Sequence, residues 1–228
     1  SAAPPVLAGG ARFEDECIRM VAGGTDIDGT SDGLHFVYQS LEGNGSLVAQ
    51  LSEAVWSANA KAGVMIRESL DPGSPHASML CQNRGLSREY AFVERAASNG
   101  PSTRTAAGSL LIPNAWVKIE RIGDELIGST SSDGAAWTEA SRTTIGLPGT
   151  ALIGLAATAR DTIGQGTEIE ALFCNVTLTK GVGPTEPTFH RGDANGDGQM
   201  NITDGIFVLN YLFLGGETPG CIEAANGN

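Results

Sequence analysis

The sequence has few basic residues, few aromatic ones and no long apolar run. No segment reaches the roughly 18 consecutive apolar residues that a membrane-spanning helix needs, so a membrane span is excluded. Lys and Arg number 14 against 26 Asp and Glu. A net charge of −12 argues against nucleic acid as a partner, because its phosphates attract basic surfaces. The four cysteines lie far apart without a CxxC pair, which argues against a zinc site or a thioredoxin-type redox motif.

Glycine is abundant, with 31 residues in a chain of 228, and 10 prolines add further turn chemistry. This composition favours many short strands joined by tight turns. Segments that are rich in β-branched or aromatic residues alternate at period two, as half-buried strands do. The sequence therefore predicts an all-β fold, a two-sheet antiparallel sandwich of the jelly-roll kind. The predicted strands are 34–40, 46–56, 61–69, 76–83, 88–96, 116–122, 125–131, 151–159 and 168–179.

The string GVGPTEPT at residues 181–188 interrupts this pattern. It has two prolines, two glycines and no large apolar side chain, which is typical of a short extended linker. We therefore predict a sandwich domain at residues 1–180 and a second segment at residues 189–228. The second segment is the more acidic, with five Asp and Glu against the single cation Arg191.

Within the predicted sandwich, Trp116 to Trp137 carries the pattern W-x-K-x-x-R…S-x-D-G-x-x-W. With AGVMIRES at 62–69, it resembles a bacterial family of concanavalin A-like β-sandwiches over residues 11–179. This resemblance implies a secreted or cell-surface module. Alternation places Val117 and Ile119 on one face of the strand, opposite Lys118 and Glu120. Both tryptophans are then either sheet-packing residues or platforms for sugar rings.

The same fold also carries glycoside hydrolases, which need two carboxylates about 5 Å apart when they retain configuration. The nearest candidates are Asp26 with Asp28 and Glu168 with Glu170, each spaced i, i+2 on one strand face. Neither pair has a third carboxylate in register. Glu168 and Glu170 are better explained as the solvated face of the last strand, opposite Ile169. No catalytic residues are therefore assigned, and we expect no enzymatic activity.

The segment DANGDGQMNITD at 193–204 has the spacing of a calcium-binding loop. Calcium takes about six to eight oxygen ligands, and this pattern supplies them around one turn. Gly198 permits the sharp bend in the loop. Calcium is therefore the expected cofactor. The predicted ligands are Asp193, Asn195, Asp197, the Gln199 carbonyl, Asn201 and Asp204.

The loop and the apolar stretch after it resemble a type I dockerin repeat, with Asp at the closing position and no entering helix. The resemblance covers 189–228, and the second repeat is truncated after CIEAANGN. It implies docking to a cohesin-like receptor. Residues 202–214 predict a helix whose apolar stripe would be a partner-binding surface if left uncovered. The stripe consists of Ile202, Ile206, Leu209 and Phe213.

The sandwich resemblance also bears on the cysteines. Chain ends often pair in this fold, which would bring Cys17 and Cys174 within disulfide distance; the alternative is buried free thiols. The start at Ser1, with no signal-like segment, is expected for a mature secreted chain.

Three function classes follow from these observations. The leading prediction is a secreted, non-catalytic module whose calcium-stabilised tail associates with another protein or with a second copy. The alternative is a carbohydrate-binding, lectin-like module, and a glycoside hydrolase is a third candidate. The sequence favours the first because aromatic residues are only 6% of the chain and the paired carboxylates are missing.

Overall fold

The computed structural model describes residues 9–55, 58–84, 88–113, 115–161, 166–181, 194–195 and 201–216. The chain forms two compact units, residues 1–182 and 183–228, and each is treated by itself below. In the described part, no helix combines the length and the apolarity needed to cross a membrane.

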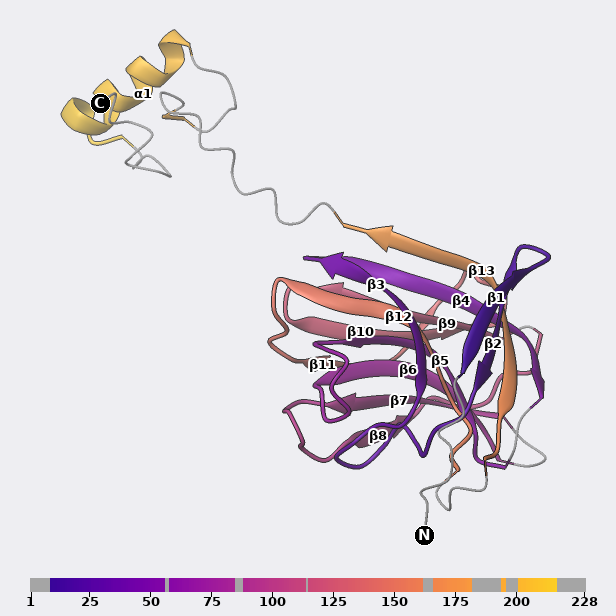
Figure 1. The fold of residues 1–228 in the computed structure, drawn as a ribbon. Helices are drawn as coiled ribbons and strands as arrows, with labels where there is room; N and C mark the ends of the chain where they lie inside the picture. Colours follow the sequence, from indigo (N-terminus) through magenta and orange to yellow (C-terminus); the bar gives the residue numbers. More distant parts are fainter. Residues whose placement is uncertain are drawn as a thin grey trace. The chain divides into compact units, whose positions relative to one another are not determined.

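The first unit is an antiparallel β-sandwich of two sheets (Figure 1). The larger sheet has seven strands in the order β1-β2-β13-β4-β9-β10-β11. Its last strand in the chain, β13, lies between β2 and β4, so the end of the unit pairs with its beginning. The strands are β1 (Gly10–Glu14), β2 (Cys17–Ala22), β4 (Gly45–Val55), β9 (Ala115–Ile122), β10 (Glu125–Ser131), β11 (Thr138–Thr144) and β13 (Ile169–Lys180).

The second sheet has six strands in the order β3-β12-β5-β6-β7-β8. Strand β3 lies at one edge and pairs with β12 from His35 to Glu42. Among the described residues no strand pairs with the other side of β3. The strands are β3 (His35–Glu42), β5 (Lys61–Arg67), β6 (His76–Asn83), β7 (Arg88–Arg95), β8 (Thr103–Ala106) and β12 (Thr150–Thr158).

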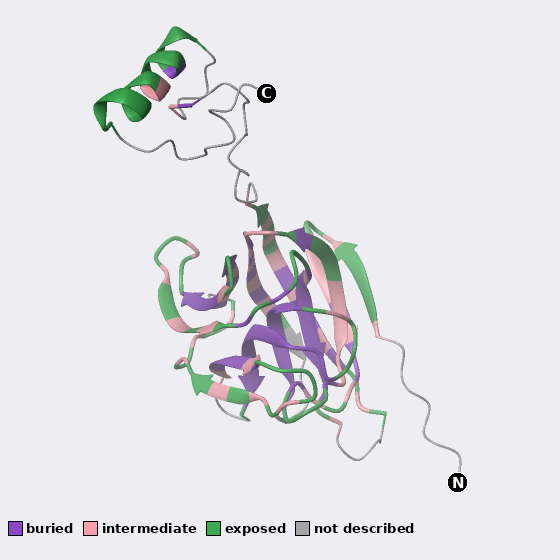
Figure 2. Cartoon of the chain, turned by 90° about the vertical axis from the view of Figure 1, so that its left-hand side faces the viewer, coloured by how far each residue is buried: buried purple, intermediate pink, exposed green. Residues whose placement is uncertain are grey.

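The main core lies between the two sheets (Figure 2). It follows from alternation along each strand, because every second side chain faces the opposite sheet. In β9 the buried residues Val117 and Ile119 alternate with the half-buried Lys118 and Glu120, as the sequence predicts. The predicted all-β, two-sheet class is therefore confirmed.

The outer face of the six-stranded sheet is also covered. A small apolar cluster that includes Met65 and Leu80 lies there beneath Ile27, which belongs to the connection between β2 and β3. Next to this cluster the carboxylate of Asp32 accepts hydrogen bonds from Arg95. Because the same connection supplies Ile27 and Asp32, it is held against the sheet by both apolar and charged contacts.

The predicted strands correspond to nine of the observed ones, but four were not foreseen. Strands β1 and β2 meet at a turn whose residues, Asp15 and Glu16, have φ of 48° and 63°. Such values favour Gly or Asn, so Asp-Glu carries no turn signal. The unforeseen strands β8 and β11 are mostly exposed and polar, and they lack the alternation of a half-buried strand.

The second unit contains one described helix, α1 (Ile202–Leu214), with the bounds that the sequence predicts. Asn201 caps its start, because its side chain accepts from the Thr203 N–H while the Asp204 side chain accepts from the Asn201 N–H. Gly215 ends the helix in the left-handed conformation, with φ of 69°. The local cap signals thus explain both helix boundaries.

Candidate functional site

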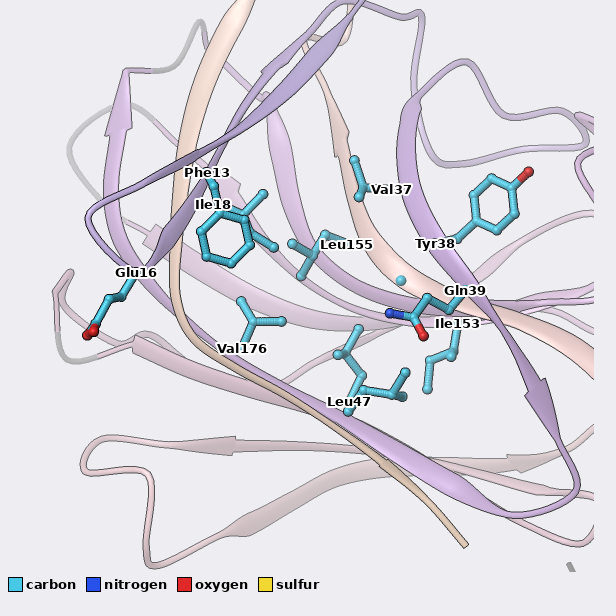
Figure 3. A pocket seen from close by; sticks show the side chains of 12 residues that line it. Phe13, Glu16, Ile18, Val37, Tyr38, Gln39, Leu47, Ile153, Leu155 and Val176 are labelled. Carbon is cyan, nitrogen blue, oxygen red and sulfur yellow. The ribbon is translucent and has the colours of Figure 1, made fainter.

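A cleft of about 290 Å³ opens at the β3 edge of the sandwich (Figure 3). Its walls come from β1, β2, β4 and β13 of the larger sheet and from β3 and β12 of the smaller one. We call it the β3-edge cleft. Its lining residues are Phe13, Glu16, Ile18, Val37, Tyr38, Gln39, Leu47, Ile153, Gly154, Leu155, Val176 and Leu178.

The cleft has an aliphatic interior and a mixed mouth. Leu47, Ile153 and Leu155 are buried and belong to the core between the sheets. The lining residues with polar side chains are Glu16, Tyr38 and Gln39, and all three are exposed to solvent. Such a combination, apolar walls with a few polar groups, is typical of small-molecule sites.

Phe13 stands at this mouth on the β1–β2 hairpin, with 78% of its surface exposed. The hairpin is held in two ways. A disulfide joins Cys17 to Cys174 on β13, the pairing expected from the resemblance, with 4.3 Å between the Cα atoms. Arg19 donates hydrogen bonds to Glu14 at 2.8 and 3.0 Å, which lowers the pKa of that carboxyl. The position of Phe13 therefore depends on anchored strands on both sides of the turn.

Tyr38 supplies a second exposed ring, on β3. Its ring stacks on that of Phe36, with 5.3 Å between the centroids and 14° between the planes. The guanidinium of Arg67 lies 5.9 Å from the centre of the Phe36 ring. Phe36 packs against the apolar cluster of the outer face, and it therefore fixes the orientation of the Tyr38 ring that is stacked on it. Tyr38 is thus an oriented aromatic surface, 43% exposed, on the outer face of β3 beside the cleft.

Three of the four carboxylates considered for hydrolysis, Asp26, Asp28 and Glu170, occupy ion pairs elsewhere. Lys61 reaches Asp26 at 2.8 Å and Asp28 at 3.5 Å, and Arg160 contacts Asp26 at 3.0 Å. Glu170 contacts a cation too, the half-buried Arg19, at 3.4 Å. None of these acids lines the β3-edge cleft. Through these ion pairs, the acids hold the loops and strands of the sandwich together outside the cleft.

Glu168 and Glu170 also occupy the face that the sequence predicts. Glu168 is exposed and Glu170 half-buried, while the intervening Ile169 is buried. The last strand therefore turns its acids outward and its apolar residues into the core.

Trp116 and Trp137 lie together on the outer face of the seven-stranded sheet, both half-buried. The turn at Asp133 brings Trp137 back over the sheet, where Lys118 lies 5.3 Å from its ring centre. Gly134 packs against the Trp116 ring so closely that a Cβ there would overlap it. This covering favours the sheet-packing alternative for Trp116.

Part of the predicted calcium loop is described. Asp193, Asp197 and Gln199 lie outside the described residues. The carboxylate of Asp204 accepts from the N–H groups of Asn201 at 2.8 Å and Asn195 at 3.3 Å, which lowers its pKa. Among the described residues, no group of three or more His, Cys, Asp or Glu is arranged so that it could hold a metal ion.

These contacts suit a calcium loop. The contact between Asn195 and Asp204 brings the third position of the loop against its closing position, and the Asn195 amide also donates to Thr203. Calcium prefers oxygen ligands from carboxylates and amides, which is the donor set that this spacing supplies. Three of the six predicted ligands, Asn195, Asn201 and Asp204, are described, and calcium binding by this loop stays a prediction.

The predicted partner-binding residues are all on α1, and none is buried. Ile202 is 81% exposed and Phe213 is 75% exposed, while Ile206 and Leu209 have about half of their surfaces exposed. Figure 2 shows most of the helix in the colour of exposed residues. Within the described residues, the helix leaves its apolar stripe uncovered.

Sequence reasoning missed the β3-edge cleft. Phe13 lies on a strand that carries no strand signal, and Tyr38 alternates with core residues of β3 as any strand aromatic would. Only the pairing of β2 with β13, far apart in the chain, brings them to one opening. No local pattern could have identified this site.

No protein-family model matches the sequence, and no curated protein matches it. Solved structures do resemble the fold. A functionally unknown protein from Saccharomyces cerevisiae is 16% identical with a TM-score of 0.62; the match covers 76% of this chain and 93% of that one. A xylan β-1,4-xylosidase from Bacillus halodurans is 12% identical with a TM-score of 0.52, over 75% of this chain and 38% of that one. The carbohydrate-binding module CBM66 from Bacillus subtilis is 15% identical with a TM-score of 0.47, over 76% and 92%.

Proposed function

We propose that this protein is a secreted, non-catalytic glycan-binding module, and that a sugar ring packs at the mouth of the β3-edge cleft. One observation carries this proposal. Among the described residues of the sandwich, the exposed aromatic residues are Phe13 and Tyr38, and both border the β3-edge cleft. The Phe13 ring stands at its mouth, and the Tyr38 ring lies beside Phe36 on the outer face of β3. Sugar rings have apolar C–H faces, and aromatic rings offer them a flat apolar surface.

The polar groups at the mouth suit the same ligand. Gln39 provides an amide that both donates and accepts, while the Tyr38 hydroxyl and the Glu16 carboxylate lie at the rim and extend away from the cleft (Figure 3). Sugar hydroxyls need such partners when they leave water. The candidate carboxylate pairs lie away from the cleft, which favours binding without hydrolysis.

Binding to insoluble and soluble polysaccharides tests this proposal. The intact chain should bind at least one polysaccharide of a panel that includes xylan, cellulose, laminarin and levan, without releasing reducing ends. Phe13→Ala and Tyr38→Ala should each weaken that binding by about fivefold, since stacking on one aromatic ring contributes about 1 kcal/mol. Leu111→Ala is the matched control, because Leu111 is equally exposed but lies outside the cleft. Unchanged binding in both aromatic variants would overturn the assignment.

The tail supports a second function, calcium-dependent association with a cohesin-like receptor or with another copy of the chain. The specific observation is the exposed apolar stripe of α1. Large exposed apolar surfaces mark interaction sites. The capping box that starts the helix uses Asn201 and Asp204, both predicted calcium ligands, so ion binding and helix order share residues.

Analytical ultracentrifugation tests this association with calcium and with chelator. Calcium should raise the sedimentation coefficient of the chain alone, or of a mixture with a cohesin domain. Phe213→Asp should abolish the change. Asn210→Asp adds the same charge at an exposed position of the same helix and should retain it. Association that persists in chelator and in Phe213→Asp would show that the tail is not an assembly device.

A further inference from the structure

The interior of the β3-edge cleft differs chemically from its mouth. Ile18, Val37, Val176 and Leu178 continue the aliphatic surface of the core residues out to the opening. None of these side chains carries a hydrogen-bonding atom. Figure 3 shows the side chains of Ile18, Val37 and Val176 gathered inside the cleft, while Glu16 and Tyr38 extend away from it.

This interior does not suit sugar hydroxyl groups. A hydroxyl that left water for an aliphatic surface would lose its hydrogen bonds without gaining new ones, which is unfavourable. A sugar ring is therefore favoured at the mouth, where the Gln39 amide can pair with its hydroxyls. Whatever enters the interior has to be apolar.

The cleft exists before a ligand arrives. The β1–β2 hairpin that carries Phe13 is tied to β13 by the Cys17–Cys174 disulfide, and Ile18 and Val176 lie one and two residues from those cysteines. The disulfide thus holds together the two strands that form one wall. Little ordering is needed on binding, which favours affinity.

Extending the proposed function, on which this step rests, we propose that the cleft holds an apolar substituent of the glycan, an aryl or short acyl group attached to the sugar. A volume of about 290 Å³ lies at the small end of ligand sites, and it suits such a group rather than a long lipid chain. The exposed ring of Phe13 would cover the substituent from the side of the hairpin.

Calorimetric titration with matched glycosides tests this inference. The probes are the methyl and phenyl β-glycosides of glucose, galactose and xylose, with phenol alone as a third ligand. The phenyl glycoside should bind about tenfold more tightly than the methyl glycoside of the same sugar, because an apolar group gains about this much in an apolar pocket.

Two variants with nearly unchanged shape test the location. Val37→Thr and Val176→Thr place a hydroxyl in the interior and should reduce the phenyl preference to about twofold or less. Both positions are half-buried, and thermal unfolding verifies that the variants fold. Phe13→Ala, at an exposed position, tests the same cleft independently. Leu111→Ala is the control and should retain the full preference for the phenyl glycoside.

The outcomes separate this inference from the function it rests on. Equal binding of methyl and phenyl glycosides would overturn the substituent site while leaving glycan binding intact. Phenol that binds as tightly as its glycosides, with no binding of methyl glycosides or polysaccharides, would overturn glycan binding itself. A phenyl preference that survives both threonine variants and Phe13→Ala would place the apolar site elsewhere and overturn the inference.

Discussion

The Asp32 carboxylate accepts hydrogen bonds from both terminal nitrogens of Arg95, at 2.7 and 2.8 Å, and neither side chain is exposed to solvent. Arg67 and His76 lie 3.6 and 3.7 Å from the same carboxylate. Asp32 belongs to the connection that covers the outer face of the six-stranded sheet. One acid is therefore the shared counter-ion of two buried guanidinium groups, and it anchors a long connection.

We predict that Asp32→Asn lowers the free energy of unfolding by about 3–5 kcal/mol, because it leaves two buried guanidinium groups without their counter-ion. Urea unfolding followed by tryptophan fluorescence measures this loss. Glu139→Gln is the control, since Glu139 pairs with Arg142 on the surface, where such a pair contributes at most about 1 kcal/mol. A loss in Asp32→Asn no larger than in the control contradicts the prediction.

The stability of the sandwich should fall as the pH drops below neutral. Burial, with the nearby charges of Arg95 and Arg67, lowers the pKa of His76 from 6.5 to about 3. Between these values the unfolded chain takes up a proton that the folded one excludes. Each pH unit in this window should therefore cost up to about 1.4 kcal/mol.

Urea midpoints measured from pH 7 to pH 4 test the role of His76. His76→Gln should flatten this dependence. His35→Gln is the comparison variant for the same pH series. His35 lies at the start of the edge strand β3, and its partial burial also lowers its pKa. An equally steep pH dependence in His76→Gln would contradict the assignment.

Removal of the disulfide should destabilise the sandwich and loosen the wall of the β3-edge cleft that β2 and β13 form. Cys17 and Cys174 are separated by 157 residues, and a crosslink closing so long a loop typically contributes about 2–4 kcal/mol. The double variant Cys17→Ala with Cys174→Ala should lose stability in this range. Peptide mapping without reductant should recover the two cysteines in one linked pair.

The remaining described cysteine should be unreactive in the folded protein. Cys81 is buried, and burial raises the pKa of its thiol to about 12. The thiolate that reacts with alkylating agents is then scarce at neutral pH. Mass spectrometry after iodoacetamide treatment should show Cys81 modified in denaturant and not in native buffer; rapid native labelling would contradict this.

Calcium should bind the tail through the loop at 193–204, and Asp193→Ala should abolish that binding because it removes the first carboxylate. Isothermal titration measures the affinity. Far-UV circular dichroism should show that calcium raises the helical signal, since Asp204 serves both the loop and the helix cap. Glu53→Ala removes an exposed carboxylate from the sandwich and should leave the affinity unchanged.

The sequence by itself determined the features that depend on neighbouring residues. Alternation at period two placed Val117 and Ile119 in the core, and an Asn cap with a following glycine set both ends of α1. These are short-range effects, in which a residue and its near neighbours in the chain decide the backbone.

Only the tertiary structure decided which distant segments meet. The pairing of β2 with β13 joins Cys17 to Cys174, and the uncovered side of β3 leaves Phe13 and Tyr38 at one opening. The buried pair of Asp32 and Arg95 likewise joins residues that no local pattern connects. Strand order and register arise from packing of the whole sandwich, because each strand can satisfy its own alternation with many different partners.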